Sequence, residues 1–345
     1  MKIAQLAPLW KEVPPKKYGG TELIVSLLTE ELVKMGHDVV LYACGGSKTA
    51  GKLVEIIPQP LFDILGRFVF DSINPYDLMA VKRAFDDAKK GRVDIIHNHM
   101  GQHVAALESF SPVPMITTNH SGYKPDFPAL SRAAKKSRYI SVSDGQRKSI
   151  PYLNYIKTIY HGIDTSNFPF VSTPGDYLLF LATMWRDKGV DRAIKIAKKT
   201  GMRLIMAGNI REESSDFEDI KDQIDGEQIS FIGEVDSEQK KKLFQNALAY
   251  LFPIRVNESF GLTVAESLAS GTPVIAWPNG SMPEIIIDNV NGYLVESIPE
   301  AVEKIECIPN ISRQACRDDV VKRFDVSTMA KNYLKLYEDV VAGEY

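Results

Sequence analysis

The sequence predicts an α/β protein of two domains, each built on a doubly wound parallel sheet. Strand and helix patterns alternate along the chain, which is typical of parallel sheets with helices on both faces. At 345 residues the chain is long for one domain. The segment 162–176 is rich in turn formers and lacks periodicity, so we interpret it as an interdomain linker. Two such domains predict a ligand cleft between them, outside the carboxyl ends of their strands.

The chain opens with a strand, a glycine-containing turn, a helix and a second strand. Lys2–Ala7 has the pattern of a buried strand, and a loop with Gly19 and Gly20 follows. Apolar residues then recur at helical spacing up to Gly36, and Asp38–Ala43 is the next strand. This order is a Rossmann-type opening. Its adjacent glycines do not fit the G-x-G-x-x-G fingerprint, which counts against a nicotinamide dehydrogenase.

The alternation continues through both halves of the chain. In the first half it predicts helices over Tyr76–Lys90 and Gly101–Ser109, and strands over Leu53–Ile57, Val93–His97, Met115–Thr118, Tyr139–Val142 and Thr158–Tyr160. In the second half it predicts strands over Tyr177–Ala182, Arg203–Ala207, Ile229–Ile232, Ala249–Phe252, Val274–Ala276 and Tyr293–Val295, with helices between them. A last helix is expected over Ser327–Val341.

Composition describes a globular enzyme, with 44% hydrophobic and 25% charged residues. A net charge of -3 is too near neutral to suggest a nucleic-acid partner. Through Tyr160 there are 21 Lys and Arg against 15 Asp and Glu. This basic half is compatible with peripheral contact at an anionic membrane or with an acidic acceptor, but scattered solvated lysines are the preferred interpretation. The three cysteines lack metal or disulfide spacing, and no signal peptide or transmembrane run is evident, so we expect a cytoplasmic protein.

The stretch 258–276 joins two carboxylates to a predicted helix N-terminus. Glu258 precedes the turn Ser259-Phe260-Gly261, and Glu266 lies one turn inside the helix that follows. A helix N-terminus offers unpaired N–H groups and a positive dipole end, which suit a phosphate. Carboxylates accept hydrogen bonds from hydroxyls. The pattern therefore fits a sugar nucleotide; an amphipathic helix with solvated acids is the alternative.

These residues resemble the signature of glycosyltransferase family 4, retaining enzymes of the GT-B fold that use nucleotide sugars. The resemblance rests on Glu258 and Glu266 with seven residues between them and on the following GTPVIA. Further matches over the chain are KYGGTE, DIIHNH, TTNH, DKGVDRAI and FIGEV. The run YGGTELIVSLLTEELVKMGHDVVLYA resembles, less specifically, a subgroup that includes pteridine glucosyltransferases.

The resemblance implies two Rossmann-like domains that face a cleft, with the C-terminal helix crossing back to the first domain. It implies an acceptor-side domain over 1–163 plus about 327–345 and a nucleotide-sugar domain over 164–326. Glu258 would bind hydroxyls of the donor sugar, and Glu266 those of the ribose. The other implied donor-binding residues, acting mainly through their backbones, are Gly19, Gly20, Asn209, Ile232, Phe260, Gly261, Leu262 and Thr263. For the glycine pair an ordinary flexible loop is the alternative.

The predicted cationic part of the site departs from the family pattern. Lys188 would clamp the diphosphate as it leaves. The family usually has an arginine five residues earlier, where this chain has Thr183. Arg186 either substitutes for it or is a solvent-facing loop arginine.

Three histidines end first-domain strands. The resemblance places His120 beside the donor sugar, where a neutral imidazole can hydrogen-bond a hydroxyl. His97 and His99 lack a Cys, Asp or Glu partner for a metal, so packing or acceptor-side hydrogen bonding is the preferred interpretation.

The resulting hypothesis is metal-independent transfer of a hexose to an acceptor hydroxyl with retention. The leaving phosphate would take the acceptor's proton on the same face, with no covalent nucleophile. UDP-glucose is the first expected donor and GDP-mannose the second; the acceptor is unknown and no cofactor is expected. Acceptor loops would fall at 10–18, 62–74 and 122–128. A nucleotide-sugar epimerase and a non-catalytic nucleotide-sugar-binding protein are the alternatives.

Overall fold

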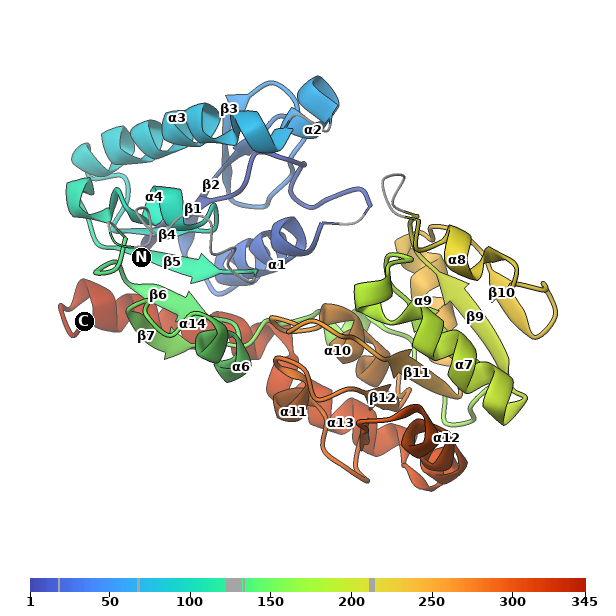
Figure 1. The fold of residues 1–345 in the computed structure, drawn as a ribbon. Coiled ribbons are helices and arrows are strands. Elements are labelled where there is room, and N and C mark those ends of the chain that lie inside the picture. The colour runs from blue at the N-terminus through green and yellow to red at the C-terminus, as the bar shows by residue number, and fades with distance from the viewer. Residues whose placement is uncertain (18, 67–68, 122–131, 133, 211–214) are drawn as a thin grey trace. The chain divides into compact units, whose positions relative to one another are not determined.

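The computed structural model describes residues 1–17, 19–66, 69–121, 132, 134–210 and 215–345. Within these ranges the chain divides into two compact units (Figure 1). Unit 1 comprises Met1–Gly162 and Val326–Tyr345, and unit 2 comprises Ile163–Asp325. The predicted acceptor loop 122–128 lies outside the described residues, as do parts of the loops at 10–18 and 62–74.

Unit 1 is built on a parallel sheet with the described strand order β3-β2-β1-β4-β5-β6-β7. Its strands are β1 (Lys2–Leu6), β2 (Asp38–Cys44), β3 (Lys52–Ile57), β4 (Ile95–Asn98), β5 (Met115–Asn119), β6 (Tyr139–Ser141) and β7 (Tyr155–Thr158). Its helices are α1 (Gly20–Lys34), α2 (Leu61–Leu65), α3 (Val69–Lys89), α4 (Gln102–Ala105), α6 (Asp144–Ser149) and α14 (Val326–Val341). The chain moves outward from β1 through α1 and returns to β4 through α3, so right-handed crossovers place α1 and α3 on opposite faces.

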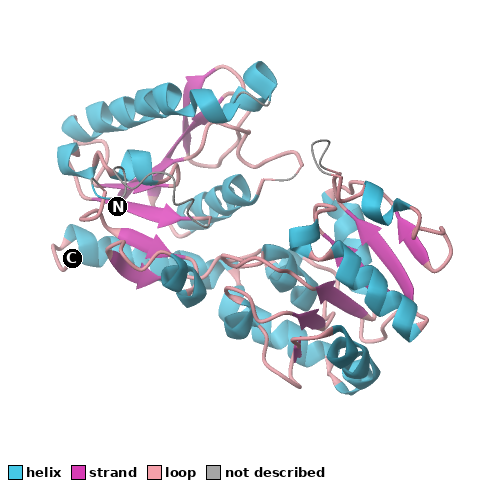
Figure 2. Ribbon diagram, viewed as in Figure 1, coloured by secondary structure: helices cyan, strands magenta, loops and turns pink. Residues whose placement is uncertain are grey.

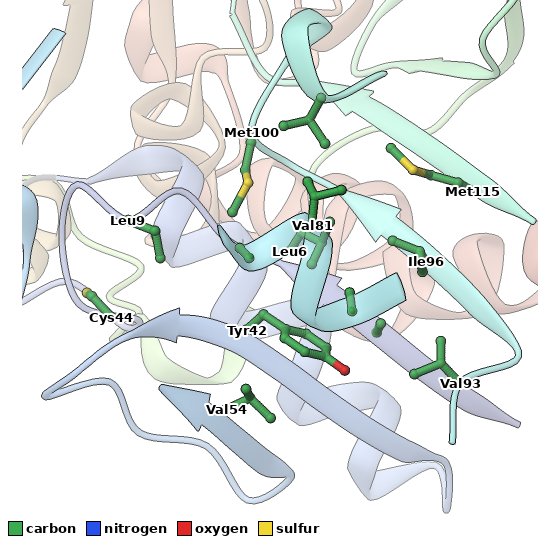
Figure 3. Close-up of a cluster of buried hydrophobic side chains, with 14 of the residues drawn as sticks. Leu6, Leu9, Tyr42, Cys44, Val54, Val81, Val93, Ile96, Met100 and Met115 are labelled. Carbon is green, nitrogen blue, oxygen red and sulfur yellow. The ribbon is translucent and has the colours of Figure 1, made fainter. Parts of the chain in front are cut away.

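The core of unit 1 follows from the two-residue period of its strands. Leu6 and Tyr42 point to the α3 face, where they pack with Val81 and Ile96 (Figure 3). The alternate residue Leu41 points to the other face and joins a second cluster around α1. Burying one such aliphatic side chain stabilises the fold by about 1.5–3 kcal/mol.

Unit 2 is again a sheet with helices around it (Figure 2). Its strand order among the described residues is β10-β9-β8-β11-β12-β13. Its strands are β8 (Tyr177–Leu181), β9 (Arg203–Ala207), β10 (Ile229–Phe231), β11 (Ala249–Phe252), β12 (Val274–Ala276) and β13 (Gly292–Leu294). Its helices are α7 (Val190–Thr200), α8 (Glu218–Lys221), α9 (Ser237–Asn246), α10 (Leu262–Ala269), α11 (Met282–Ile285), α12 (Ile298–Cys307) and α13 (Arg313–Phe324). The order reverses between β8 and β11, and ligands of such sheets bind outside the carboxyl ends of the strands at that point.

The C-terminal helix α14 belongs to unit 1, as the predicted fold class required (Figure 1). Its apolar face buries Met329, Tyr333, Leu336, Tyr337 and Val340, and it packs against α1. The chain therefore leaves the first sheet, builds the second, and returns to the first. Among the described residues no helix combines the length and apolar character needed to cross a bilayer.

Three predicted elements differ from the structure. The last strand of unit 1 is Tyr155–Thr158 rather than 158–160, because this edge strand is only half-buried and lacks a continuous apolar run. The helix expected from Tyr76 begins at Val69 and contains Pro75. The helix expected over 101–109 ends at Ala105 and is followed by a 3-10 turn over Glu108–Phe110.

Candidate active site

The turn before α10 brings the predicted donor-site backbone to the carboxyl-end side of β11. Gly261 ends this turn with φ +89°, a left-handed conformation that side chains disfavour. A Cβ atom there would lie 2.7 Å from Cε of Met282, so the end of that side chain would have to shift. The helix begins at once with Leu262 and Thr263, whose N–H groups have no carbonyl partner inside the helix. Phe260 is 2% exposed and packs its ring against Phe324, which anchors the turn.

Glu258 and Lys188 form an ion pair, with 2.8 Å between Oε2 and Nζ. The other carboxylate oxygen accepts a hydrogen bond from the Ser259 N–H at 3.2 Å. The two side chains are 22% and 28% exposed, so they remain accessible to a ligand. The Glu258 backbone pairs with Gly280, where an added Cβ would lie 2.1 Å from the Glu258 carbonyl oxygen. The loop around Gly280 therefore fixes where the Glu258 carboxylate stands.

Glu266 is buried on α10, 3% exposed, and one of its carboxylate oxygens has a partner. Oε1 accepts from Lys240 Nζ at 2.6 Å. Oε2 is buried and makes no hydrogen bond with any described residue. Leaving a buried acceptor unpaired costs about 1–3 kcal/mol, so this oxygen is a candidate acceptor for a ligand hydroxyl. Sequence reasoning missed Lys240, because nothing in the run of three lysines on α9 distinguishes it.

The loop after β8 holds Lys188 and Arg186 in a 3-10 turn. Lys188 points to Glu258, whereas Arg186 is exposed and its N–H donates to Asp216 Oδ2 at 2.9 Å. Arg255, absent from the predicted site, supports this turn by donating to the Arg186 carbonyl oxygen. The Arg255 guanidinium also donates to the two carboxylate oxygens of Asp191 on α7, at 2.7 and 2.8 Å, so Arg255 joins this turn to α7.

Thr183 occupies the position at which the family pattern has arginine, and its side chain hydrogen-bonds a neighbouring strand end. Its hydroxyl donates to Asn209 Oδ1 at 2.7 Å, which joins the ends of β8 and β9. Asn209 is exposed. No charged side chain at this position meets the expected diphosphate, so the cationic part of the candidate site consists of Lys188 with Arg186 nearby.

Ile232 follows β10, and its side chain is 49% exposed. Its N–H donates to the Met206 carbonyl at 3.0 Å as part of the sheet. A nucleobase would therefore meet the carbonyl of Ile232, not its N–H group.

In unit 1 the two predicted glycines lie at the N-terminus of α1. Gly19 precedes the helix and Gly20 begins it. A Cβ at Gly19 would lie 2.8 Å from Cβ of Pro15 and 3.0 Å from a carboxylate oxygen of Glu22. Glu22 is 4% exposed, and burial raises the pKa of its carboxyl group. Sequence reasoning named the glycines but not this carboxyl group in the first helical turn.

His120 follows β5, and both of its ring nitrogens contact other histidines. Nε2 lies 2.8 Å from His99 Nδ1, and Nδ1 lies 3.4 Å from His161 Nε2. Burial lowers the pKa of His120 to about 3, so the ring is neutral at physiological pH. Its longer contact is the one that a ligand hydroxyl would replace most readily. His97 lies deeper and bonds Tyr337 and Thr118. In the part of the chain that the structure describes, no group of three His, Cys, Asp or Glu side chains is arranged to hold a metal.

Two protein-family models match this chain, one over most of each unit. Residues 18–167 match the family model described as Glycosyltransferase Family 4, and residues 166–309 match that of Glycosyl transferases group 1. An uncharacterized glycosyltransferase of Methanocaldococcus jannaschii is 25% identical over 400 residues, with 98% of each chain covered.

Two solved structures share the fold over their full length. Sucrose-phosphate synthase from Thermosynechococcus elongatus has a TM-score of 0.80 at 18% identity, covering 99% of both chains. An Anabaena protein in complex with UDP has a TM-score of 0.76 at 16% identity, covering 98% of this chain and 100% of that one. With two parallel α/β sheets and both family models matched in order, this chain belongs to glycosyltransferase family 4 and has the GT-B type of fold.

Proposed function

We propose that this glycosyltransferase moves a hexose from a nucleoside-diphosphate sugar to an acceptor hydroxyl with retention at the anomeric carbon. The observation that carries the proposal is the pair of carboxylates at the N-terminus of α10. Glu258 is exposed enough to accept from sugar hydroxyls, and Glu266 keeps one buried oxygen without a partner among the described residues. A ribose diol supplies two adjacent donors for such an oxygen.

The diphosphate would lie against the N–H groups at the start of α10, with Lys188 as its counter-charge. We propose no covalent nucleophile, as the family resemblance implies, and assign Glu258, which is paired with Lys188, to binding sugar hydroxyls. The leaving phosphate oxygen would take the acceptor's proton on the face from which the acceptor approaches. The protein's contribution is then orientation and charge stabilisation. His120, Gly19 and Gly20 of unit 1 are proposed to contact the same donor.

UDP-glucose is the first donor that we propose, and GDP-mannose is the second. The Anabaena protein of the same fold has also been solved with UDP-glucose, which supports a uridine donor. Resemblance to pteridine glucosyltransferases favours glucose but stays a prediction. A cytoplasmic location and peripheral membrane contact are likewise proposals.

A donor panel tests the function. Release of nucleoside diphosphate is measured with UDP-, GDP- and ADP-sugars, and UDP-glucose is expected to give the highest rate. Glu258→Ala is expected to lower that rate by about 10²-fold, because the sugar loses its main acceptor. Donor binding without release would instead indicate a non-catalytic binding protein, for which Thr183 in place of arginine is the motivating observation. Conversion of the sugar without acceptor would indicate an epimerase.

Turnover in excess chelator is expected to equal turnover without it. Lys188 and the helix N-terminus supply the positive charge that a divalent ion would otherwise provide. The measurement is the initial rate with UDP-glucose before and after chelation. A complete loss that added Mg²⁺ or Mn²⁺ restores would contradict metal independence.

A further inference from the structure

A buried chain of hydrogen bonds in unit 1 joins His120 to the C-terminal helix. It begins at His161, passes through His120 and His99, and reaches Gln5 on β1. From Gln5 it continues through Tyr337 on α14 to His97 on β4, and it ends at Thr118 and Tyr333. Six of its seven contacts measure between 2.7 and 3.2 Å, and the contact between His161 and His120 measures 3.4 Å.

The imidazoles of this chain are neutral. His97 is 0% exposed, and His99 and His161 are each 4% exposed. Burial holds the pKa of each of these three well below its usual range, and neighbouring histidines add to the effect. A neutral imidazole has one N–H donor and one acceptor nitrogen. If one ring nitrogen donates a hydrogen bond, the other must therefore accept one.

Gln5 is the group of this hydrogen-bond chain whose donor and acceptor are different atoms, so its polarity reverses only if the whole amide turns over. Hydroxyls donate or accept, and neutral imidazoles exchange tautomers, but an amide oxygen only accepts and an amide nitrogen only donates. Gln5 Oε1 lies 2.7 Å from His99 Nε2, so that nitrogen carries the proton. His99 Nδ1 is then an acceptor, and His120 must donate to it from Nε2.

The amide nitrogen of Gln5 sets the donor and acceptor roles in the hydrogen bonds on the other side of the amide. Gln5 Nε2 donates to the Tyr337 hydroxyl at 3.2 Å, and that hydroxyl donates to His97 Nδ1 at 2.7 Å. His97 Nε2 then donates to the Thr118 hydroxyl oxygen at 2.7 Å. Tyr337 thus accepts from the amide nitrogen, while the amide oxygen accepts from His99.

We propose that Gln5 is a positioning residue, which fixes His120 in the tautomer protonated at Nε2 and keeps Nδ1 an acceptor. The kinetic consequence rests on the proposed function, in which a donor-sugar hydroxyl donates to Nδ1 in place of His161. With the other tautomer, Nδ1 would carry a proton and the hydroxyl would have to accept instead. Gln5 lies on β1, the first strand of the chain, and was not among the site residues predicted from the sequence.

The test is the tautomer of His120, read from the ¹⁵N shifts of its ring nitrogens in protein labelled at histidine. In the wild-type chain Nε2 is expected to be protonated. Gln5→Met keeps the side-chain length but removes the polar ends, and it is expected to give a mixture of tautomers. The matched control is Tyr333→Phe, which removes the last hydroxyl of the hydrogen-bond chain and leaves Gln5 in place. The tautomer of His120 should therefore be unchanged.

A kinetic arm separates this proposal from the proposed function. Gln5→Met is expected to lower kcat by about 2- to 10-fold, the value of one hydrogen bond, with little change in KM for the donor. If no donor is turned over, the proposed function fails while the tautomer measurement still stands. A wild-type His120 protonated at Nδ1, or a tautomer ratio unmoved by Gln5→Met, would overturn the proposal, and the wild-type spectrum suffices if the variant does not fold.

Discussion

Replacement of Lys188 by alanine is expected to lower kcat by about 10²- to 10³-fold while leaving the order of preferred sugars unchanged. The Lys188 ammonium is proposed to neutralise charge that grows on the diphosphate as the bond to the sugar breaks, so its loss acts mainly on turnover. Glu258→Gln is expected to lower kcat and also to change sugar preference, because a carboxylate that accepts from two hydroxyls becomes an amide with one donor end. For each of the two variants, kcat and KM are measured with every sugar nucleotide of the donor panel.

Lys199→Ala is the matched control, since Lys199 is an exposed lysine at the end of α7, the helix that follows Lys188. It should retain wild-type rates. The double variant K188A/E258Q measures the coupling across the 2.8 Å ion pair. Wild-type activity in both single variants would show that donor chemistry does not take place at this pair.

Acidification from pH 7.5 to 5.5 is expected to destabilise unit 1 strongly. The folded state keeps His97, His99 and His161 neutral because burial lowers their pKa values, whereas in the unfolded chain they titrate near 6.5. The unfolded state therefore binds more protons, and stability is lost as pH falls below 6.5. Each of these three histidines lowers the free energy of unfolding by about 1.4 kcal/mol per pH unit there, or about 4 kcal/mol together at pH 5.5, and His120, whose pKa burial lowers to about 3, adds to this loss.

Buried carboxyl groups act in the opposite direction and reduce this loss. Burial raises the pKa values of Glu22, Asp77 and Glu108, so the folded state takes up their protons at higher pH than the unfolded chain does. Hydrogen exchange followed by mass spectrometry at the two pH values measures the effect in each unit. Unit 2 is the internal control, because all six histidines precede its first residue, Ile163. Equal protection of β4 and β5 at both pH values would contradict the prediction.

The alternation of strand and helix patterns was sufficient to predict both sheets, because buried parallel strands are short apolar runs separated by amphipathic helices. The alternation predicted the edge strand of the first sheet less accurately. Tyr155–Thr158 is half-buried, so its residues resemble a loop, and the prediction fell on the apolar residues just after it. The helix α3 was predicted from Tyr76, but it begins at Val69 and contains Pro75, a residue that usually ends or kinks a helix.

Local spacing identified the backbone of the candidate donor site. Gly261, the first turn of α10 and the two glutamates lie within nine positions of one another, so a short turn and the helix that follows it bring them together. The predicted alternative of solvated acids does not hold for Glu266, which is 3% exposed. Burial of a carboxylate depends on what packs over it, and that is a property of the assembled unit.

By itself, then, the sequence determined the two α/β units and the short motifs that belong to family 4, while the return of the last helix to the first unit was predicted from the family resemblance alone. Only the tertiary structure decided which side chains meet: Lys240 with Glu266, Lys188 with Glu258, and Gln5 with His99 and Tyr337. Gln5 and Tyr337 stand 332 positions apart in the chain. Hydrophobic periodicity records which face of each element is buried, whereas a hydrogen bond between side chains depends on strand order and helix docking, which periodicity does not specify.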